Sequence, residues 1–180
     1  ARTAKISGLS PPSEPADVIR ARRMDYFRSM AAGQGPRLAV IEDIDYPNCI
    51  AGWWGEVHVA VHKGLGQVGA ITNGVMRDLD VMDAGFPVLA GSVGPSHGFV
   101  HVVEIGGPVS LMGMHISQDE LVHADRHGAI VIPNEIILDL KPAIETVIAN
   151  EAIVLGPARA SDFDIEKLEK AWDEFEAART

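Results

Sequence analysis

Two short, almost continuous apolar runs constrain the fold of this chain more than any other feature of its sequence. Residues 38–44 and 68–72 are rich in branched apolar side chains and too short for a helix of usual length. Such runs are typical of strands that are buried on both faces. Between them, residues 56–63 have the pattern of a helix that ends at Gly64. The sequence therefore predicts covered strands joined by helical connections.

The predicted secondary structure of the rest of the chain changes along its length. Residues 16–32 are a predicted helix closed by Gly33, and residues 78–84 a short helical turn. Further strands are predicted at residues 5–7, 87–90, 99–105, 109–112, 120–123 and 129–132. The last four, separated by Gly- and Pro-containing turns, suggest an antiparallel meander or a small barrel. The whole pattern predicts one mixed α/β domain over residues 1–180.

Two helices are predicted at the C-terminal end. Pro142 suits the first position of a helix that runs to about residue 153. Ser161 can cap a last amphipathic helix within residues 160–180, with an apolar stripe. The stripe contains Ile165, Leu168, Trp172 and Phe175. It can pack on its own domain or on a neighbouring subunit, and the sequence leaves both open.

Composition excludes several classes of function. The formal net charge of −10 argues against a nucleic-acid-binding surface, which needs clustered Lys and Arg. The densest basic cluster, residues 20–23, is short and suits a solvated helix face. Cys49 is the only cysteine, so we expect a reducing, cytoplasmic location. No apolar run approaches the length of a membrane span, so no membrane association is expected.

One constellation of residues is able to carry chemistry. Glu56 opens the predicted helix directly after Gly55, where free backbone N–H groups can bind a carboxylate. Twenty residues further on, Arg77 and Asp78 follow a predicted strand, so that a guanidinium clamp and a Mg²⁺ or Mn²⁺ ligand can face one cleft. The alternative is that Glu56 only complements its helix dipole while Arg77 and Asp78 form a surface ion pair.

The chain contains a Gly-x-x-x-Glu motif that is followed, after twenty residues, by Arg-Asp. This combination resembles the signature of the RraA-like family. Residues 68–80, 86–88 and 119–133 extend the resemblance in order. It implies a swivelling β/β/α fold assembled as a homotrimer, or as a dimer of trimers. It also implies a class II aldolase acting on 4-hydroxy-4-methyl-2-oxoglutarate, an oxaloacetate decarboxylase, or a non-catalytic regulator of RNase E.

The resemblance also implies roles for individual residues. The backbone amides of Gly55, Glu56, Val57 and His58 would bind the pyruvyl part of a small 2-keto acid. Arg77 would bind its carboxylate and carbonyl side, and Asp78 would hold the divalent metal. Glu56 would position the water that acts as base. Glu151 is the best match to a glutamate that catalytic members take from a neighbouring subunit.

Two features depart from the family pattern. The usual N-terminal helix is missing, so we expect either that the sequence starts downstream of it or that this member differs. The helix after Glu56 carries His58 and His62, four residues apart on one face. This pair is either a partial zinc site or two ordinary histidines, and the second interpretation is favoured because no third ligand is evident.

Retention of Glu56, Arg77 and Asp78 together favours an enzyme, since an inhibitor of RNase E does not need the set. The sequence therefore predicts a metal-dependent carbon–carbon lyase that forms a pyruvate enolate. His97 and His101, with Trp53 and Trp54, can help to shape its substrate pocket, although packing is the simpler role for them.

Overall fold

A computed structural model describes residues 1–179 and divides them into two units. The first unit is Ala1–Ile132, and the second begins at Pro133. The sequence predicted one domain over residues 1–180. The first unit is a mixed α/β structure with a mixed sheet, and the second is helical, which confirms the predicted fold class.

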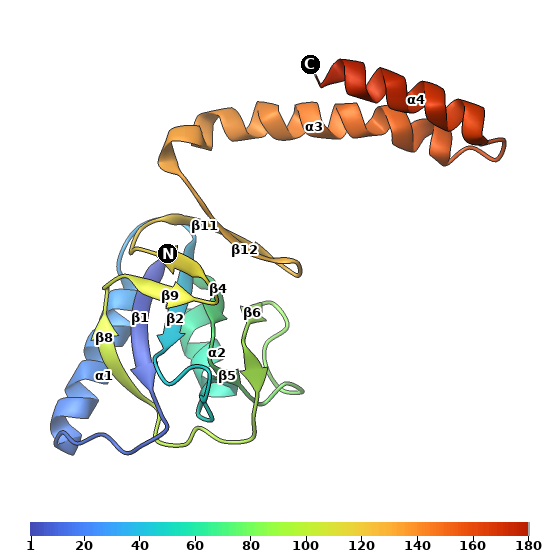
Figure 1. Cartoon of the computed structure of the whole chain (residues 1–180). Helices are drawn as coiled ribbons and strands as arrows, with labels where there is room; N and C mark the ends of the chain where they lie inside the picture. The colour runs from blue at the N-terminus through green and yellow to red at the C-terminus, as the bar shows by residue number, and fades with distance from the viewer. Residues whose placement is uncertain (180) are drawn as a thin grey trace. The chain divides into compact units, whose positions relative to one another are not determined.

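Five strands form the main sheet of the first unit (Figure 1), in the order β6-β4-β2-β1-β8. They are β1 (Arg2–Ser7), β2 (Arg37–Asp43), β4 (Gln67–Thr72), β6 (Val88–Leu89) and β8 (His101–Ile105). The first four run parallel to their neighbours, whereas β8 is antiparallel to β1. The two apolar runs that dominate the sequence are therefore β2 and β4, at and next to the centre of this sheet.

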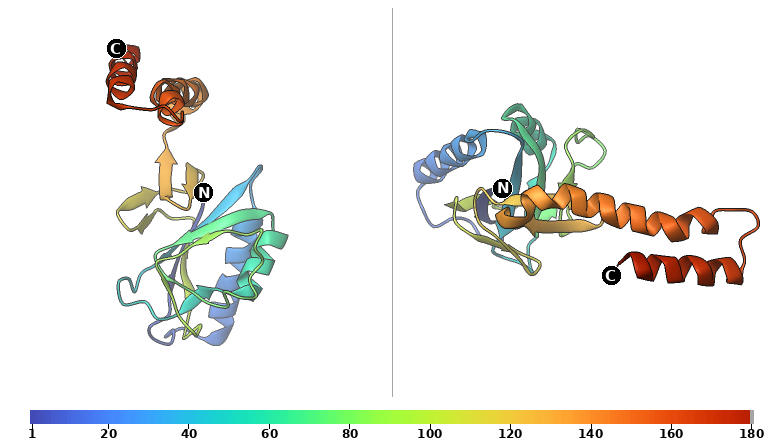
Figure 2. Two further views of the ribbon diagram at one scale, coloured as in Figure 1. Left: turned by 90° about the vertical axis from the view of Figure 1, so that its right-hand side faces the viewer. Right: turned by 90° about the horizontal axis from the view of Figure 1, so that it is seen from above.

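Both faces of β2 are buried, which explains its continuous apolar run. Ala39 and Ile41 face the core shared with α1 (Ala16–Ala31) and α2 (Glu56–Gly64), two helices on the same side of the sheet (Figure 2). Val40 belongs to a second cluster, together with residues of β9 (Val109–Leu111) and β10 (Met114–Ile116). Alternate side chains of one strand thus enter two separate cores.

Three very short strands form a second, parallel sheet in the order β3-β5-β7. They are β3 (Gly52–Trp54), β5 (Val75–Met76) and β7 (Ser92–Val93). Because β3 and β5 are parallel, their carboxyl ends lie at the same edge. The residues that follow them are Gly55 on one strand and Arg77 on the other.

The β-rich middle consists of hairpins rather than a barrel. β9 pairs with β10, and β11 (Leu121–Asp125) pairs with β12 (Gly128–Ile132), each pair antiparallel. The sequence did not predict β10, which is three residues long and follows a turn at Gly113 with a φ of 88°. The segment predicted as a helical turn at residues 78–84 forms irregular turns.

The second unit is a helical hairpin whose boundaries differ from those predicted. A 3₁₀ turn, η1 (Asn134–Ile136), leads into α3 (Ile137–Ala158), so Pro142 lies inside this helix and not at its first position. The last helix, α4 (Ile165–Ala178), is capped by Asp164, whose side chain accepts a 2.9 Å hydrogen bond from the Lys167 N–H. Ser161 therefore lies within the turn between the two helices and is not the cap.

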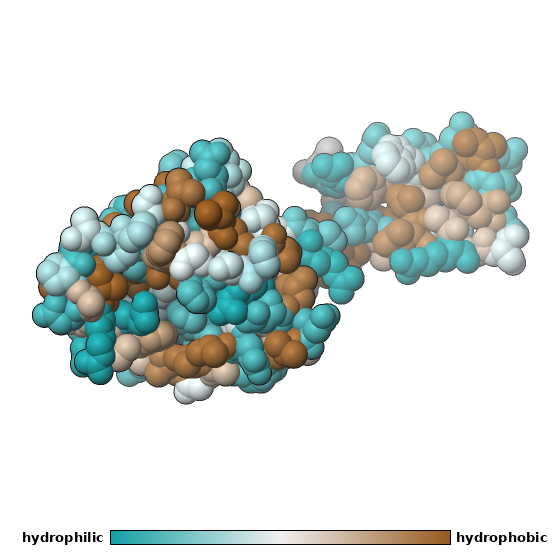
Figure 3. Space-filling view, turned by 90° about the horizontal axis from the view of Figure 1, so that it is seen from below, coloured by the Kyte–Doolittle hydropathy of each residue, from teal (hydrophilic) through white to brown (hydrophobic). Residues whose placement is uncertain are grey.

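The apolar stripe of α4 packs only in part on α3 of the same chain, since Ile165 and Trp172 remain 64 and 49 % exposed. Trp172 and Phe175 line a hollow with Val154 and Leu155. Other apolar side chains of α3 remain exposed, and brown groups lie among teal ones over this hairpin in Figure 3. Ile144, Val147 and Ile148 are exposed to 48, 54 and 61 %. Among the described residues, no helix has both the length and the apolar character needed to cross a membrane.

Asp43, the last residue of β2, is a buried carboxyl group with one unsatisfied oxygen. Its Oδ1 accepts a 3.0 Å hydrogen bond from the Asp45 N–H, whereas its Oδ2 is buried without a partner. Burial raises the pKa of Asp43 from its ordinary value of 3.8 to about 6. The folded state therefore binds a proton at Asp43 more tightly than the unfolded chain does.

This linkage predicts a pH-dependent effect of Asp43→Asn. Stability from the protonated carboxyl group should be present below pH 4 and lost as the pH rises through about 6. A shift of this size corresponds to at most about 3 kcal/mol. Relative to wild type, the free energy of unfolding of the variant should rise between about pH 4 and 7 in urea titrations. The exposed Asp80→Asn is the control for loss of charge. If the difference in free energy of unfolding between Asp43→Asn and wild type did not change with pH, this would contradict the buried state of Asp43.

Candidate functional site

The N-terminus of α2 meets the loop that follows β5. Gly55 is the N-cap residue in extended conformation, and the first helical hydrogen bond runs from the Val59 N–H to the Gly55 carbonyl oxygen, 3.0 Å. The Glu56 N–H instead donates to Asp78 Oδ2, 3.2 Å. The N–H groups of Val57 and His58 precede the first helical bond and are therefore free to bind an anion.

Arg77 and Asp78 form an ion pair at this edge. Arg77 Nη1 lies 2.5 Å from Asp78 Oδ2, and the side chains are exposed to only 22 and 28 %. The Arg77 N–H donates to the Trp54 carbonyl oxygen at 2.8 Å, which holds the loop beside the end of β3. Asp78 adopts a φ of 61°, an uncommon conformation for a residue other than glycine. Asp78 Oδ2 thus accepts from both the guanidinium and the helix.

Glycine is required at position 55 by close packing. A Cβ atom there would lie 2.5 Å from Asp78 Oδ2 and 2.9 Å from Arg77 Cζ. At Gly52, a Cβ atom would lie 3.2 Å from Arg77 Cδ. The two glycines of the motif therefore let β3 and the start of α2 approach the arginine side chain directly.

A cavity of about 280 Å³ opens beside Arg77. Its lining contains two arginines, two histidines and no acidic side chain. The lining residues are Arg23, Gly52, Trp53, Val57, His58, Arg77, His97 and Val100. Arg77 Nε is buried and has no hydrogen-bond partner within the described residues. A bound anion would supply the missing acceptor, so the cavity suits a negatively charged ligand.

His62 is fully buried in a hydrogen-bonded chain and lies apart from this cavity. Its Nδ1 donates to the His58 carbonyl oxygen at 2.6 Å, so its Nε2 accepts from the Tyr26 hydroxyl at 2.5 Å. Trp53 Nε1 donates in turn to the Tyr26 oxygen at 3.4 Å. Both ring nitrogens of His62 are therefore used, which contradicts the zinc interpretation of His58 and His62.

Burial keeps both histidines of α2 neutral at pH 7. Desolvation, followed by the charges of His62, Arg23 and Arg77, lowers the pKa of His58 to about 3. Desolvation also lowers the pKa of His62 to about 4. The edge of the His58 ring packs on Trp53 with ring centroids 4.1 Å apart. His58 therefore contributes a neutral, rigid wall to the cavity, and its positive charge comes from the arginines.

The structure brings together most, but not all, of the residues expected at the site. Val57, His58 and Arg77 line the cavity, and Gly55 and Asp78 lie directly behind it. The Glu56 side chain is exposed, and its carboxylate has no hydrogen-bond partner among residues 1–179. Glu151 lies on α3 of the second unit, beside the hollow under Trp172. Its action across a subunit interface stays a prediction.

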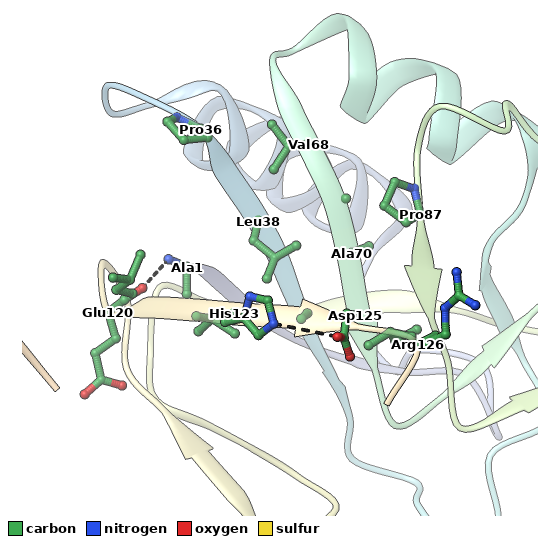
Figure 4. A pocket seen from close by; sticks show the side chains of 15 residues that line it. Ala1, Pro36, Leu38, Val68, Ala70, Pro87, Glu120, His123, Asp125 and Arg126 are labelled. Carbon is green, nitrogen blue, oxygen red and sulfur yellow. Dashed lines mark hydrogen bonds and ion pairs between the residues drawn. The ribbon is translucent and has the colours of Figure 1, made fainter. Parts of the chain in front are cut away.

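A larger cavity, of about 520 Å³, lies elsewhere (Figure 4). It is bounded by Leu38, Val68 and Pro87 on one side and by the β11–β12 hairpin on the other. Its walls are mainly apolar. On the hairpin, His123 Nε2 and Asp125 Oδ2 are 3.9 Å apart and both side chains are largely exposed. Because it lacks buried polar groups that converge on one point, size alone does not make it the candidate site.

A comparison with models of protein families identifies the family to which this chain belongs. The RraA-like model, described as Aldolase/RraA, matches residues 18–131, which include α1 and both parts of the Arg77 site. The chain belongs to the RraA-like family. The family includes aldolases and decarboxylases as well as regulators of RNase E, so membership alone does not decide between these functions. No curated protein sequence matches the chain.

Solved structures confirm the fold. A protein described as a novel cellulase from microbes associated with the gut ecosystem has a TM-score of 0.62 and 21 % identity, over 83 % of this chain and 65 % of that one. This chain thus spans less than two thirds of that protein. An uncharacterized Pseudomonas syringae protein gives 0.63 and 19 %, over 96 and 75 % of the two chains. Streptomyces coelicolor RraAS2, of the RNase ES inhibitor RraA family, gives 0.61 and 20 %, over 83 and 72 %.

Sequence reasoning missed two residues of the cavity lining, Arg23 and Val100. Arg23 is exposed, as expected for a solvated helix face, and it also lines the cavity, which was not predicted. His97 and Trp53 also line it, as the pocket interpretation expected, whereas His101 is not part of the lining and Trp54 is fully buried in the core. No signal in the sequence marks Arg23, because its place depends on how α1 packs against the sheet.

Proposed function

We propose that this RraA-like protein is a carbon–carbon lyase that cleaves a small 2-keto acid through a pyruvate enolate. The supporting observation is the cavity in which Arg77, held by Asp78 against Gly55, has a buried Nε without an acceptor. A guanidinium that is fixed by one carboxylate is pre-organised to bind a second. Aldol cleavage and β-decarboxylation share the enolate step, so the same cavity serves either reaction.

In this proposal each residue has a defined part. Arg77 binds the substrate carboxylate with the Val57 and His58 amides and stabilises the negative charge that develops on the C2 oxygen. Neutral His58 and the buried Trp53 exclude water from one wall. The exposed Glu56 opens α2 beside Val57 of the cavity lining, and its carboxylate would hold the water that accepts the substrate proton.

The donor set fits Mg²⁺ or Mn²⁺ rather than zinc. Within residues 1–179 no group of three or more His, Cys, Asp or Glu side chains is arranged to hold a metal ion. Mg²⁺ needs only one or two carboxylates and keeps several waters. Asp78 Oδ2 is engaged by Arg77 and Glu56, so Oδ1 is the oxygen that would hold a divalent cation or its water. Such a cation would act as a Lewis acid toward the enolate oxygen.

The direct test is pyruvate release from oxaloacetate and from 4-hydroxy-4-methyl-2-oxoglutarate, with Mg²⁺ or Mn²⁺ and with EDTA. Release that requires the metal would support the lyase. Absence of release by the folded protein would contradict it and favour the non-catalytic alternative, for which inhibition of RNase E would be measured next. The homotrimer that the family resemblance implies stays a prediction and is measured in the same preparation by light scattering.

Asp78→Asn is expected to raise the metal concentration needed for half-maximal activity by at least about tenfold, because a neutral amide is a weaker ligand for a hard cation. The amide oxygen can still accept from the Glu56 N–H, so the cap of α2 is retained. Activity titrated with Mn²⁺ measures the effect, and the exposed Asp80→Asn in the same loop is the control. An unchanged metal requirement would exclude Asp78 as the ligand.

A further inference from the structure

Helix α1 brings a second arginine to the Arg77 cavity. Arg23 lies in the middle of α1, yet it lines the same cavity as Arg77, His58 and His97. The lining thus joins residues from α1, α2, the loop after β5 and the loop before β8. A substrate bound to Arg77 would have this second, solvent-exposed guanidinium at the wall of the same cavity.

Arg23 differs from Arg22 and Arg28 of α1, because its side chain has no ion-pair or hydrogen-bond partner among the described residues. Arg22 pairs with Glu14 and donates to the Val102 carbonyl oxygen, and Arg28 pairs with Asp25. Arg23 makes neither an ion pair nor a side-chain hydrogen bond within residues 1–179. A cation beside a cavity without acidic lining is therefore available to bind an anion from solution.

The charges of Arg23 and Arg77 act on the same space. Arg23 is the stronger of the two in lowering the pKa of His58, after burial and His62. His58 is therefore neutral and does not add a third charge. One of the two guanidiniums is already paired, with Asp78, which leaves the cavity with a net positive charge for a ligand that carries more than one acidic group.

We propose that Arg23 is a specificity-determining residue that binds a second carboxylate of the substrate, at the end opposite the keto acid held by Arg77. This inference rests on the proposed function for the position of the keto acid end. Arg23 is then the residue that distinguishes 2-keto dicarboxylic acids from their monocarboxylate analogues. In this arrangement Arg23 contacts the distal carboxylate of the substrate, whereas the keto acid end lies beside Arg77.

The position of the second carboxylate also distinguishes the two reactions. In aldol cleavage the C3–C4 bond breaks, its electron pair remains on the pyruvyl part as the enolate, and the C4 hydroxyl loses its proton to become a carbonyl. The carboxylate beyond C4 keeps its charge throughout, so Arg23 can hold it in substrate and product. In β-decarboxylation that carboxylate leaves as neutral CO₂, and a bound guanidinium would oppose the loss of charge. Arg23 therefore favours the aldol reaction.

The test compares two unreactive ligands that differ only at the distal end, 2-oxoglutarate and 2-oxopentanoate. Calorimetric titration in the presence of Mg²⁺ should show that wild type binds 2-oxoglutarate more tightly. Arg23→Gln should weaken binding of 2-oxoglutarate about 10- to 100-fold, the usual range for a hydrogen bond between charged groups. Binding of 2-oxopentanoate should change less than about threefold. Arg20→Gln, an equal loss of charge at an exposed position of α1 that does not line the cavity, should change neither.

The outcomes separate this inference from the proposed function. Equal binding of the two ligands by wild type, or an equal effect of Arg23→Gln on both, would overturn the role of Arg23 while leaving the lyase proposal intact. Failure of wild type to bind either 2-keto acid would overturn both. A selective loss of 2-oxoglutarate binding in Arg23→Gln alone supports Arg23 even if pyruvate release is never observed.

Discussion

Arg77→Ala is expected to reduce pyruvate release to the background rate while the protein remains folded. The substitution removes the clamp on the substrate carboxylate and the charge that faces the developing enolate. Loss of a single transition-state donor of this kind typically costs about 10²–10³ in rate, and Arg77 has two such roles. The Arg77 side chain lies 22 % exposed at the edge of the first unit, outside its apolar cores, so its removal should leave the fold intact.

Two further variants make the Arg77 experiment specific. Arg77→Lys keeps the charge but loses the planar fork, so it should recover part of the activity but not all of it. Arg20→Ala removes an exposed arginine from α1 and should leave the rate unchanged. Circular dichroism and urea titration establish that each variant is folded. Near-normal turnover by the folded Arg77→Ala variant would contradict the assignment of the Arg77 cavity as the catalytic site.

The fold could be predicted from sequence where burial alone decides the pattern. β2 was predicted because both of its faces are covered, and β4 because all of its residues except Val68 are buried. The end of α1 was predicted to within one residue. Errors occurred where local signals compete. Pro142 is a good first residue for a helix, but α3 begins earlier, at Ile137 after a 3₁₀ turn. The cap of α4 is Asp164 rather than Ser161, a choice between two capping residues only three apart.

The candidate site could be predicted only in the part that the chain carries as a motif. Spacing placed Arg77 and Asp78 opposite the start of α2, and the Glu56 N–H does meet Asp78. The same spacing does not show that the Glu56 carboxylate stays exposed while its amide makes the contact. Arg23 is more than fifty residues away in sequence, and only the packing of α1 on the sheet brings it to the cavity. Tertiary contacts of this kind leave no local pattern.

Gly55→Ala is expected to lower activity by about 100-fold although alanine adds a single methyl group. The new Cβ atom would lie 2.5 Å from Asp78 Oδ2 and 2.9 Å from Arg77 Cζ, so the ion pair has to move. A displacement of about 1 Å in a positioning group can cost about 10² in rate. The backbone itself is not strained by the change, because Gly55 is in the extended region that any residue adopts. Stability should fall by only about 1 kcal/mol, the usual value of a lost helix cap.

The other end of the same helix supplies the matched control. A Cβ atom at Gly64 would meet no heavy atom within 4 Å, so Gly64→Ala makes the same chemical change in open space. It should leave pyruvate release unchanged and leave stability equal or raised by up to about 1 kcal/mol, because alanine favours the helix. Equal losses in both variants would mean that α2 tolerates no substitution and that Gly55 has no special role. A loss confined to Gly55→Ala would tie activity to the position of the Arg77–Asp78 pair, since that pair is what the added methyl group displaces.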